Sequence, residues 1–261
     1  MTNINAISPD TSAFRARVEE TYERIARNPY SQYQLHRGPY FARHYLGYDG
    51  SDLAALPKVA ADRLVGFGNP FSIGGVTPGE TILVLGCGAG SDALIAARHA
   101  GPAGRVIGID PSPTMRTCAR MAVEEAGLSD QVAIRVGQLE ALPVADASID
   151  LVVANGSLQR TAERAHVLTE VRRVLKPRGR LYLAELVVDR QLAFDPADAA
   201  ELWAAFVAGA LLEQELMELA AQAGLRDGRL LSCYDCLRNA PLGEQAAGRL
   251  RFHGVNFFAI K

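Results

Sequence analysis

From residue 81 onward, short apolar runs alternate with segments of helical periodicity, and no other feature constrains the fold of this chain as strongly. The runs are TILVLG, RVIGID, VAIRVG, IDLVVAN and RLYLAELVV. Mostly apolar runs of this length are typical of strands that are buried on both faces of a sheet. Helical patterns lie between them near residues 91–100, 112–126 and 161–175. Strands that alternate with helices predict an α/β fold with a doubly wound, mainly parallel sheet.

The segments that flank this region predict additions to the sheet. Residues 10–27 begin with capping residues and then place apolar side chains at helical spacing. Aromatic residues and glycines are frequent from there to residue 75, so we expect residues 1–75 to form an N-terminal helical cap. Residues 76–261 are expected to form the main domain. Within it, residues 190–224 are predicted as a helical insertion, and RLLSCYD and NFFAIK as a C-terminal strand pair.

Composition narrows the classes of partner. The 27 Lys and Arg residues nearly balance the 29 Asp and Glu residues, and no basic run occurs, so we expect no nucleic acid partner. No stretch of 18 apolar residues and no signal-like start is visible, so we expect no membrane association and a cytoplasmic location. The sequence does not predict an oligomeric state.

The cysteines predict neither a disulfide framework nor a metal site. Cys87 and Cys118 are isolated, whereas Cys233 and Cys236 form a CxxC pair. One such pair, without a second pair or a histidine cluster, does not specify zinc. Two interpretations of the pair remain open: two ordinary thiols beside a strand, or a soft-ligand or redox site.

A glycine-rich turn follows the first predicted strand, in ILVLGCGAG. Gly86, Gly88 and Gly90 allow the backbone to turn sharply and to approach a ligand closely, which predicts a nucleotide-like ligand. The spacing is GxGxG, and not the GxGxxG of dinucleotide enzymes.

The next two strands carry polar residues in matching positions. Asp110 ends RVIGID, where a carboxylate can accept hydrogen bonds from both hydroxyls of a ribose. Met115 is a candidate to pack on an adenine face, and Gln138 and Glu140 follow the third strand. Alternatively, Asp110 is a turn or capping residue and Met115 belongs to the core. The order in which these residues occur favours the ligand-binding interpretation.

These segments together resemble the class I S-adenosylmethionine (SAM) dependent methyltransferases. The resemblance rests on ILVLGCGAG, VIGIDPSPTM, GQLEALPVADASIDLVVAN and EVRRVLKPRGRLYLAE, which cover about residues 80–190. It implies a Rossmann-like fold, SAM as the cofactor, and the transfer of a methyl group. The cofactor-binding residues that it implies are Gly86, Gly88, Gly90, Asp110, Pro111, Met115, Gln138, Leu139 and Asn155.

The flanking segments are similar to arsenite methyltransferases over nearly the whole chain, but the cysteines differ. That family reads GCGNP where this sequence reads GFGNP, so Phe67 stands at its first arsenic-binding cysteine. Its later cysteines, expected near Asn155–Gln159 and near Phe206, are also missing. Because trivalent arsenic is held by soft thiolates, we expect a small or medium-sized organic acceptor. A thiol or metalloid methyltransferase that uses Cys233 and Cys236 is the alternative.

Two further departures concern the cofactor. Val84 stands where the family has an acidic residue, and Gln138 stands where it has an aspartate. Gln138 still offers a hydrogen-bond donor and an acceptor to adenine, whereas Val84 offers neither. These departures motivate another alternative, a non-catalytic SAM-binding protein. A nicotinamide oxidoreductase shares the glycine turn and Asp110, but the GxGxG spacing disfavours it.

No general base stands out. His44 and His253 are the catalytic candidates, because the resemblance places the cap and the final strands beside the acceptor pocket. Candidates for the wall of that pocket are aromatic side chains whose ring faces attract positive charge. They are Tyr40, Tyr45, Tyr48 and Phe67, and simple packing of the cap onto the sheet is the alternative for each.

Overall fold

The computed structural model describes residues 20–261 except 21, 32, 34, 162, 190–209 and 241–251. One sheet runs through the molecule, with the strand order β3-β2-β1-β4-β5-β8-β7, and β6 pairs with β5 beside this path. Strands β1 to β6 pair in parallel, whereas β8 is antiparallel to both β5 and β7. The predicted doubly wound, mainly parallel sheet is confirmed.

The strands coincide closely with the predicted apolar runs. They are β1 (Thr81–Leu85), β2 (Arg105–Ile109), β3 (Val132–Arg135), β4 (Ile149–Asn155), β5 (Leu175–Val188), β6 (Leu211–Leu212), β7 (Arg226–Tyr234) and β8 (Phe252–Ile260). The helices are α2 (Gly38–Tyr45), α3 (Gly50–Ala54), α4 (Lys58–Ala61), α5 (Ser91–Ala100), α6 (Pro113–Glu125), α7 (Arg164–Val174) and α9 (Glu213–Gln222), with short 3-10 turns η1 (Pro70–Ser72) and η2 (Leu158–Arg160).

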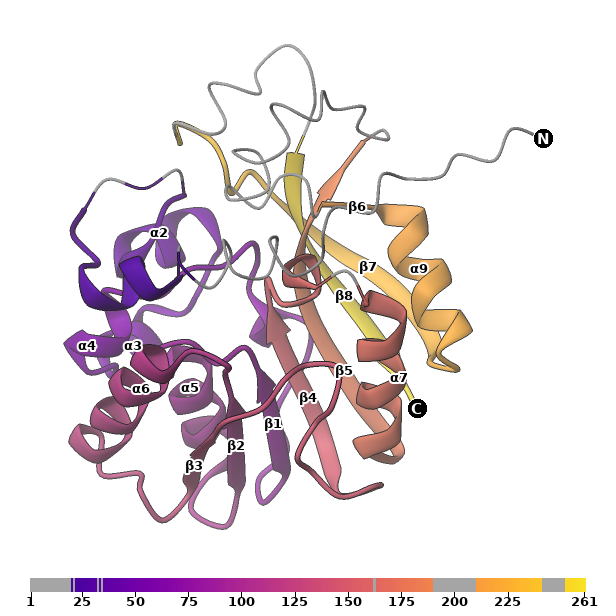
Figure 1. Ribbon diagram of the computed structural model, residues 1–261, viewed down its shortest axis with the longest axis horizontal. Coiled ribbons are helices and arrows are strands. Elements are labelled where there is room, and N and C mark those ends of the chain that lie inside the picture. Colours follow the sequence, from indigo (N-terminus) through magenta and orange to yellow (C-terminus); the bar gives the residue numbers. More distant parts are fainter. Residues whose placement is uncertain are drawn as a thin grey trace.

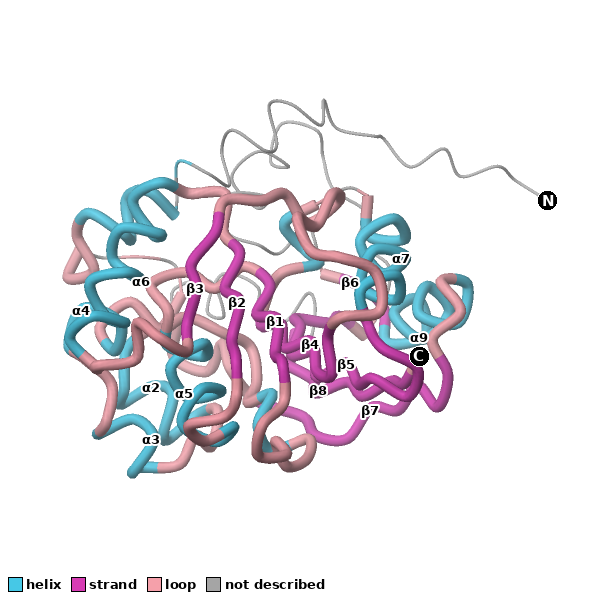
Figure 2. The backbone as a smooth tube through the Cα atoms, turned by 90° about the horizontal axis from the view of Figure 1, so that it is seen from below, coloured by secondary structure: helices cyan, strands magenta, loops and turns pink. Residues whose placement is uncertain are grey.

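The sheet separates two apolar cores, because successive side chains of a strand point to opposite faces. In β1, Ile82 and Val84 pack with α5, α6 and the N-terminal helices, whereas Leu83 and Leu85 pack with α7 and α9. Figures 1 and 2 show helices α2 to α6 on one side of the sheet and α7 and α9 on the other. Val84 is therefore a core residue in the strand whose end carries the glycine turn.

Local sequence signals account for the ends of the two helices nearest that turn. Helix α5 begins after Gly90 and is followed by Gly101, both with positive φ, at 95° and 66°. Helix α6 begins with Pro113 after the N-cap Ser112, whose hydroxyl accepts a hydrogen bond from the Met115 N–H at 3.0 Å. The ends of β1 and β2 therefore lead directly into helices.

Three expectations differ from the structure or lie partly outside it. Within the predicted insertion 190–224, Leu211–Leu212 form strand β6 against Val187 and Val188, and the helix begins only at Glu213. Pairing with the edge of β5 outweighs the helical propensity of the two leucines. Residues 190–209 of this insertion and residues 10–19 of the first predicted helix lie outside the described residues, so the division at residue 75 stays a prediction. Among the described residues, no helix is long and apolar enough to span a membrane.

Candidate functional site

The glycine turn between β1 and α5 lies at the carboxyl end of the parallel strands, where α/β folds bind their ligands. Gly86, Gly88 and Gly90 all have positive φ, at 62°, 53° and 95°. A Cβ at Gly90 would lie 3.3 Å from Cβ of Ala119 in α6, and one at Gly86 would lie 2.9 Å from Oγ of Ser157. Only glycine fits these positions, so the backbone N–H groups of the turn stay close to any bound ligand.

Asp110 fixes the neighbouring turn after β2. Its side chain is 1% exposed. Oδ2 accepts the Gly88 N–H and Oδ1 accepts the Ser112 N–H, both at 2.9 Å. Because a carboxylate oxygen can accept two hydrogen bonds, each oxygen keeps one lone pair for a ligand hydroxyl. Asp110 thus shapes the turn and remains able to bind a ribose, which combines the two interpretations that the sequence left open.

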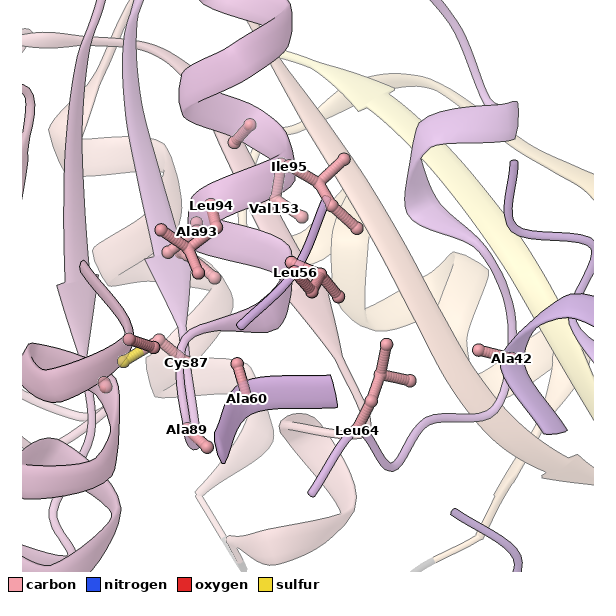
Figure 3. Packing of buried hydrophobic residues seen from close by; sticks show 14 of the residues in the cluster. Ala42, Leu56, Ala60, Leu64, Cys87, Ala89, Ala93, Leu94, Ile95 and Val153 are labelled. Atoms are coloured by element: carbon pink, nitrogen blue, oxygen red, sulfur yellow. The ribbon is translucent and has the colours of Figure 1, made fainter. Parts of the chain in front are cut away.

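Cap residues lie directly on this turn. Figure 3 shows Ala60 of α4 beside Ala89 of the turn, with Leu56 and Leu64 along the same apolar surface. The hydroxyl of Ser91, the first residue of α5, donates to the Ala60 carbonyl at 3.0 Å. Apolar contact and this hydrogen bond hold α4 against the start of α5.

The helical segment that contains Tyr22 covers the site from another side. The Glu23 carboxylate accepts hydrogen bonds from the hydroxyls of Ser112 and Thr114, directly after Asp110. The buried ring of Tyr22 lies 4.0 Å from Cζ of Arg160, which belongs to η2 after β4. Burial raises the pKa of Tyr22, and the nearby carboxylates of Asp110 and Glu185 oppose the lowering effect of Arg160. Tyr22 is therefore close to the ends of β2, β4 and β5 at once.

A buried polar network joins the cap to β4 and α5. The Tyr48 hydroxyl donates to Oδ1 of Asp92 at 2.8 Å, and Nδ2 of Asn155 donates to the Tyr48 oxygen at 3.1 Å. Asn155 also accepts the Phe67 N–H at 2.9 Å and donates to the Gly68 carbonyl at 3.0 Å. Burial raises the pKa of Asp92 to about 6. Asn155 is therefore committed to holding the cap loop at the carboxyl end of β4.

Phe67 is buried between β4 and β8. A Cβ at Gly156 would lie 2.7 Å from Cε2 of the Phe67 ring, and a Cβ at Gly254 of β8 would overlap the Phe67 carbonyl oxygen. Nearby, Nδ2 of Asn256 donates to the Asn69 carbonyl and to the Ser72 hydroxyl, each at 2.8 Å. The loop that carries Phe67 is thus fixed from both strands.

Two polar side chains at the ends of β4 and β5 have buried atoms that lack a hydrogen-bond partner. Gln159 is 2% exposed, and neither its Oε1 nor its Nε2 has one. Its Nε2 lies near Gly156, beside the Phe67 ring. Glu185 is 1% exposed, and its Oε1 accepts the N–H groups of Ser157 and Leu158 at 2.7 Å, while Oε2 lacks a partner. Buried polar atoms of this kind are uncommon and are typical of sites that bind a further group.

Burial raises the pKa of Glu185 to about 7, against the lowering effect of the Leu158 and Ser157 N–H groups and of Arg164. Because the folded-state pKa is raised, this carboxyl lowers stability as the pH rises from its unfolded value, 4.5, to about 7. We expect Glu185→Gln to increase the free energy of unfolding relative to the native protein by about 2 to 3 kcal/mol more at pH 8 than at pH 5. Urea unfolding at both pH values measures this difference, and a difference that does not change with pH contradicts it.

Comparisons with known proteins decide the family. The family model described as a methyltransferase domain matches residues 77–224, and the model of the protein-L-isoaspartate(D-aspartate) O-methyltransferases matches residues 9–142. A crystal structure of an arsenic(III) S-adenosylmethionine methyltransferase from Chlamydomonas reinhardtii has a TM-score of 0.71 and 30% sequence identity, over 81% of this chain and 72% of that one. The chain belongs to the class I SAM-dependent methyltransferases.

Other relatives define how far this result extends. An arsenite methyltransferase of Halobacterium salinarum is 36% identical over 69% of this chain and 45% of its own length. The chain spans about half the length of the curated relatives that it matches, between 45% and 55% for the first three. The crystal structure of the cyclase SpnF shares the fold, with a TM-score of 0.60 and 22% identity over 96% of this chain and 94% of that one. The methyltransferase fold therefore also occurs in an enzyme of another kind.

SAM is the methyl donor of this family, and the residues at the glycine turn fit it. Three positions without Cβ atoms leave room for the ligand, and Asp110 keeps lone pairs for its ribose. The other candidate cofactor residues lie on both sides of this turn. Met115 and Leu139 are buried in the cores, Pro111 is half-buried, and Gln138 is exposed after β3. The position of Met115 agrees with the packing alternative, and its contact with adenine stays a prediction.

The two histidine candidates lie away from the buried polar residues described above. His44 is on the exposed face of α2, where its ring stacks 4.4 Å from that of Tyr40. Nε2 of His253 lies 2.9 Å from Oε1 of Glu213 at the start of α9, on the sheet face opposite to Gly254 and Phe67. This geometry supports neither as a base beside the glycine turn, and their catalytic role stays a prediction.

The aromatic candidates divide in the same way. Tyr48 and Phe67 are buried where the cap meets the sheet. Tyr40 is exposed, and Tyr45 packs on Phe41, with the Arg238 guanidinium 5.0 Å from its ring. Tyr48 and Phe67 alone lie beside Asn155, and they remain the candidates for the pocket wall.

Sequence reasoning missed Gln159, Arg160 and Glu185 as site residues. Glu185 was visible as the one acidic residue within the apolar run RLYLAELVV, because a buried strand rarely carries an unpaired carboxylate. No sequence signal distinguished Arg160, since its position depends on how η2 folds back on the glycine turn.

Proposed function

We propose that this protein transfers the methyl group of SAM to a small or medium-sized organic acceptor at the carboxyl ends of β4 and β5. The observation that carries the proposal is the combination of the buried Phe67 ring with the partnerless Gln159 amide beside Gly156. An apolar wall with a few convergent polar groups is the usual form of a small-molecule site. No further macromolecular partner is required.

The chemistry needs mainly positioning. Methyl transfer breaks the sulfonium S–CH₃ bond, whose electron pair returns to sulfur, while the acceptor atom forms the new bond in line with it. A hydroxyl or ammonium acceptor must also lose a proton. Oε2 of Glu185 lacks a partner, and the pKa of this carboxyl, raised by burial to about 7, suits a general base. We assign that role to Glu185 in preference to His44 and His253.

The acceptor is expected to be organic, because Phe67 supplies no thiolate. In the alternative proposal, Cys233 and Cys236 build a separate soft site. Burial raises the pKa of Cys236 to about 12 and also raises that of the exposed Cys233, so both thiols are protonated near neutral pH. Among the described residues, no group of three or more Cys, His, Asp or Glu side chains could hold a metal ion. These observations disfavour the alternative.

A screen of acceptors with labelled SAM tests the proposal. We expect methylation of at least one small phenol, amine or thiol, and no methylation of arsenite by the native protein or by a Cys233→Ser/Cys236→Ser variant. Efficient arsenite methylation that the double variant loses would establish the soft site instead. SAM binding without turnover on any acceptor would favour the non-catalytic alternative.

The unpartnered amide of Gln159 allows a second test. Gln159→Met keeps the side-chain length but removes the buried polar atoms, so we expect the free energy of unfolding to increase by about 1 kcal/mol. The KM for the acceptor should rise about tenfold because a hydrogen bond is lost. Thermal unfolding and steady-state kinetics measure the two effects. Equal KM values, or a less stable variant, would show that Gln159 only fills space.

A further inference from the structure

Arg160 is the last residue of η2, immediately after the carboxyl end of β4. Its Nη1 lies 3.1 Å from the position that a Cβ would take at Gly86, so the guanidinium lies against the glycine turn. The Tyr22 ring packs 4.0 Å from its Cζ. With the residues that the structure describes, Arg160 forms neither a hydrogen bond nor an ion pair, although it is half-buried.

Other half-buried arginines near the sheet are all satisfied. Arg116 donates to the Asp110 and Pro111 carbonyls, Arg173 is paired with Glu170, and Arg180 is paired with Glu80. A guanidinium carries five donors and no acceptor and remains charged. Partial burial removes some of its water, and an aromatic face does not replace hydrogen bonds. The position is therefore suited to an anionic ligand group that binds two N–H donors side by side.

The strand order indicates which end of SAM this group belongs to. β2, β1 and β4 are neighbours, with β1 in the middle. With the ribose on Asp110 after β2, a ligand that crosses the glycine turn after β1 reaches Arg160 after β4. SAM has two ends beyond its ribose, an uncharged adenine and an amino acid with a carboxylate. Only the amino-acid end offers the anion that Arg160 lacks.

We propose that Arg160 binds the α-carboxylate of the amino-acid end of SAM and thereby selects adenosyl ligands that carry this group. The proposal rests on the proposed function, because it assumes that the glycine turn and Asp110 hold SAM. It makes Arg160 a cofactor-binding residue that acts on affinity, with no part in the methyl transfer step.

Calorimetric titration with two adenosyl compounds tests the assignment without any acceptor. S-adenosylhomocysteine keeps the α-carboxylate, whereas 5′-methylthioadenosine lacks the whole amino-acid end. For Arg160→Ala we expect the affinity for S-adenosylhomocysteine to fall about 10- to 100-fold, with the affinity for methylthioadenosine unchanged within about twofold. Arg160→Lys should lie between, since lysine offers a point charge without the fork.

Two matched variants complete the design. Arg116→Ala removes an arginine that supports the ribose turn, and should weaken both ligands alike. Arg172→Ala, exposed on α7, should weaken neither. Equal losses for both ligands in Arg160→Ala would reduce Arg160 to a support of the turn, and an unchanged affinity for S-adenosylhomocysteine would overturn the assignment. If the native protein binds neither compound, the proposed function fails first and this inference falls with it.

Discussion

Asp110→Ala is expected to lower the affinity for SAM and for S-adenosylhomocysteine by about 1,000-fold. Two hydrogen bonds from ribose hydroxyls to a carboxylate contribute about 2 kcal/mol each, and the alanine makes neither. The substitution also removes the acceptors of the Gly88 and Ser112 N–H groups, so the turn loses its bound shape. Calorimetric titration of the purified variant measures the change.

Two controls separate ligand binding from folding. Asp110→Asn keeps the size of the side chain and one acceptor oxygen, so we expect a smaller loss of affinity and a native far-UV spectrum. Asp130→Ala removes an exposed aspartate from the turn before β3, and should leave affinity unchanged. Tight SAM binding by a folded Asp110→Ala protein would contradict the assignment of the ribose site.

Gly254→Ala is expected to decrease the free energy of unfolding by about 4 kcal/mol or more, a size reserved for severe steric conflicts. A Cβ at this position of β8 would overlap the backbone carbonyl oxygen of Phe67. The loop cannot retreat, because Asn155 holds Phe67 and Gly68 and Asn256 holds Asn69. Urea unfolding followed by circular dichroism measures the loss.

Gly75→Ala provides the matched control for this prediction. Its φ is not positive, and an added Cβ would meet no atom within 4 Å. We expect a change of less than about 0.5 kcal/mol, as for other surface substitutions. If Gly254→Ala is as stable as Gly75→Ala, the packing of Phe67 against β8 is not as described, and the proposed pocket wall loses its support.

The regular elements were largely predictable because their signals are local. Helix α5 was expected at residues 91–100 and occupies Ser91–Ala100, since glycines with positive φ stand on both sides of it. Strands β1 to β4 follow their apolar runs within about two residues at each end. Leu211–Leu212 were not predictable as a strand, because their partner residues in β5 are more than twenty residues away in sequence.

The site was predictable only where one turn contains it. The glycines and Asp110 lie next to strands that the sequence reveals, so their neighbourhood followed from the topology. The contact of Tyr48 with Asp92 and the position of Arg160 against Gly86 join segments far apart in sequence, and no periodic pattern encodes them. The choice of acceptor depends on such long-range contacts, which explains why family and cofactor were easier to infer than substrate.

The central claim is that the glycine turn and Asp110 hold SAM, and titration of the purified protein with SAM, S-adenosylhomocysteine and NAD tests it most directly. The account predicts saturable binding of the two adenosyl compounds at one site and no binding of NAD. Binding of NAD, or failure of both adenosyl compounds to bind, would contradict it and would leave the family relationship as a statement about fold alone.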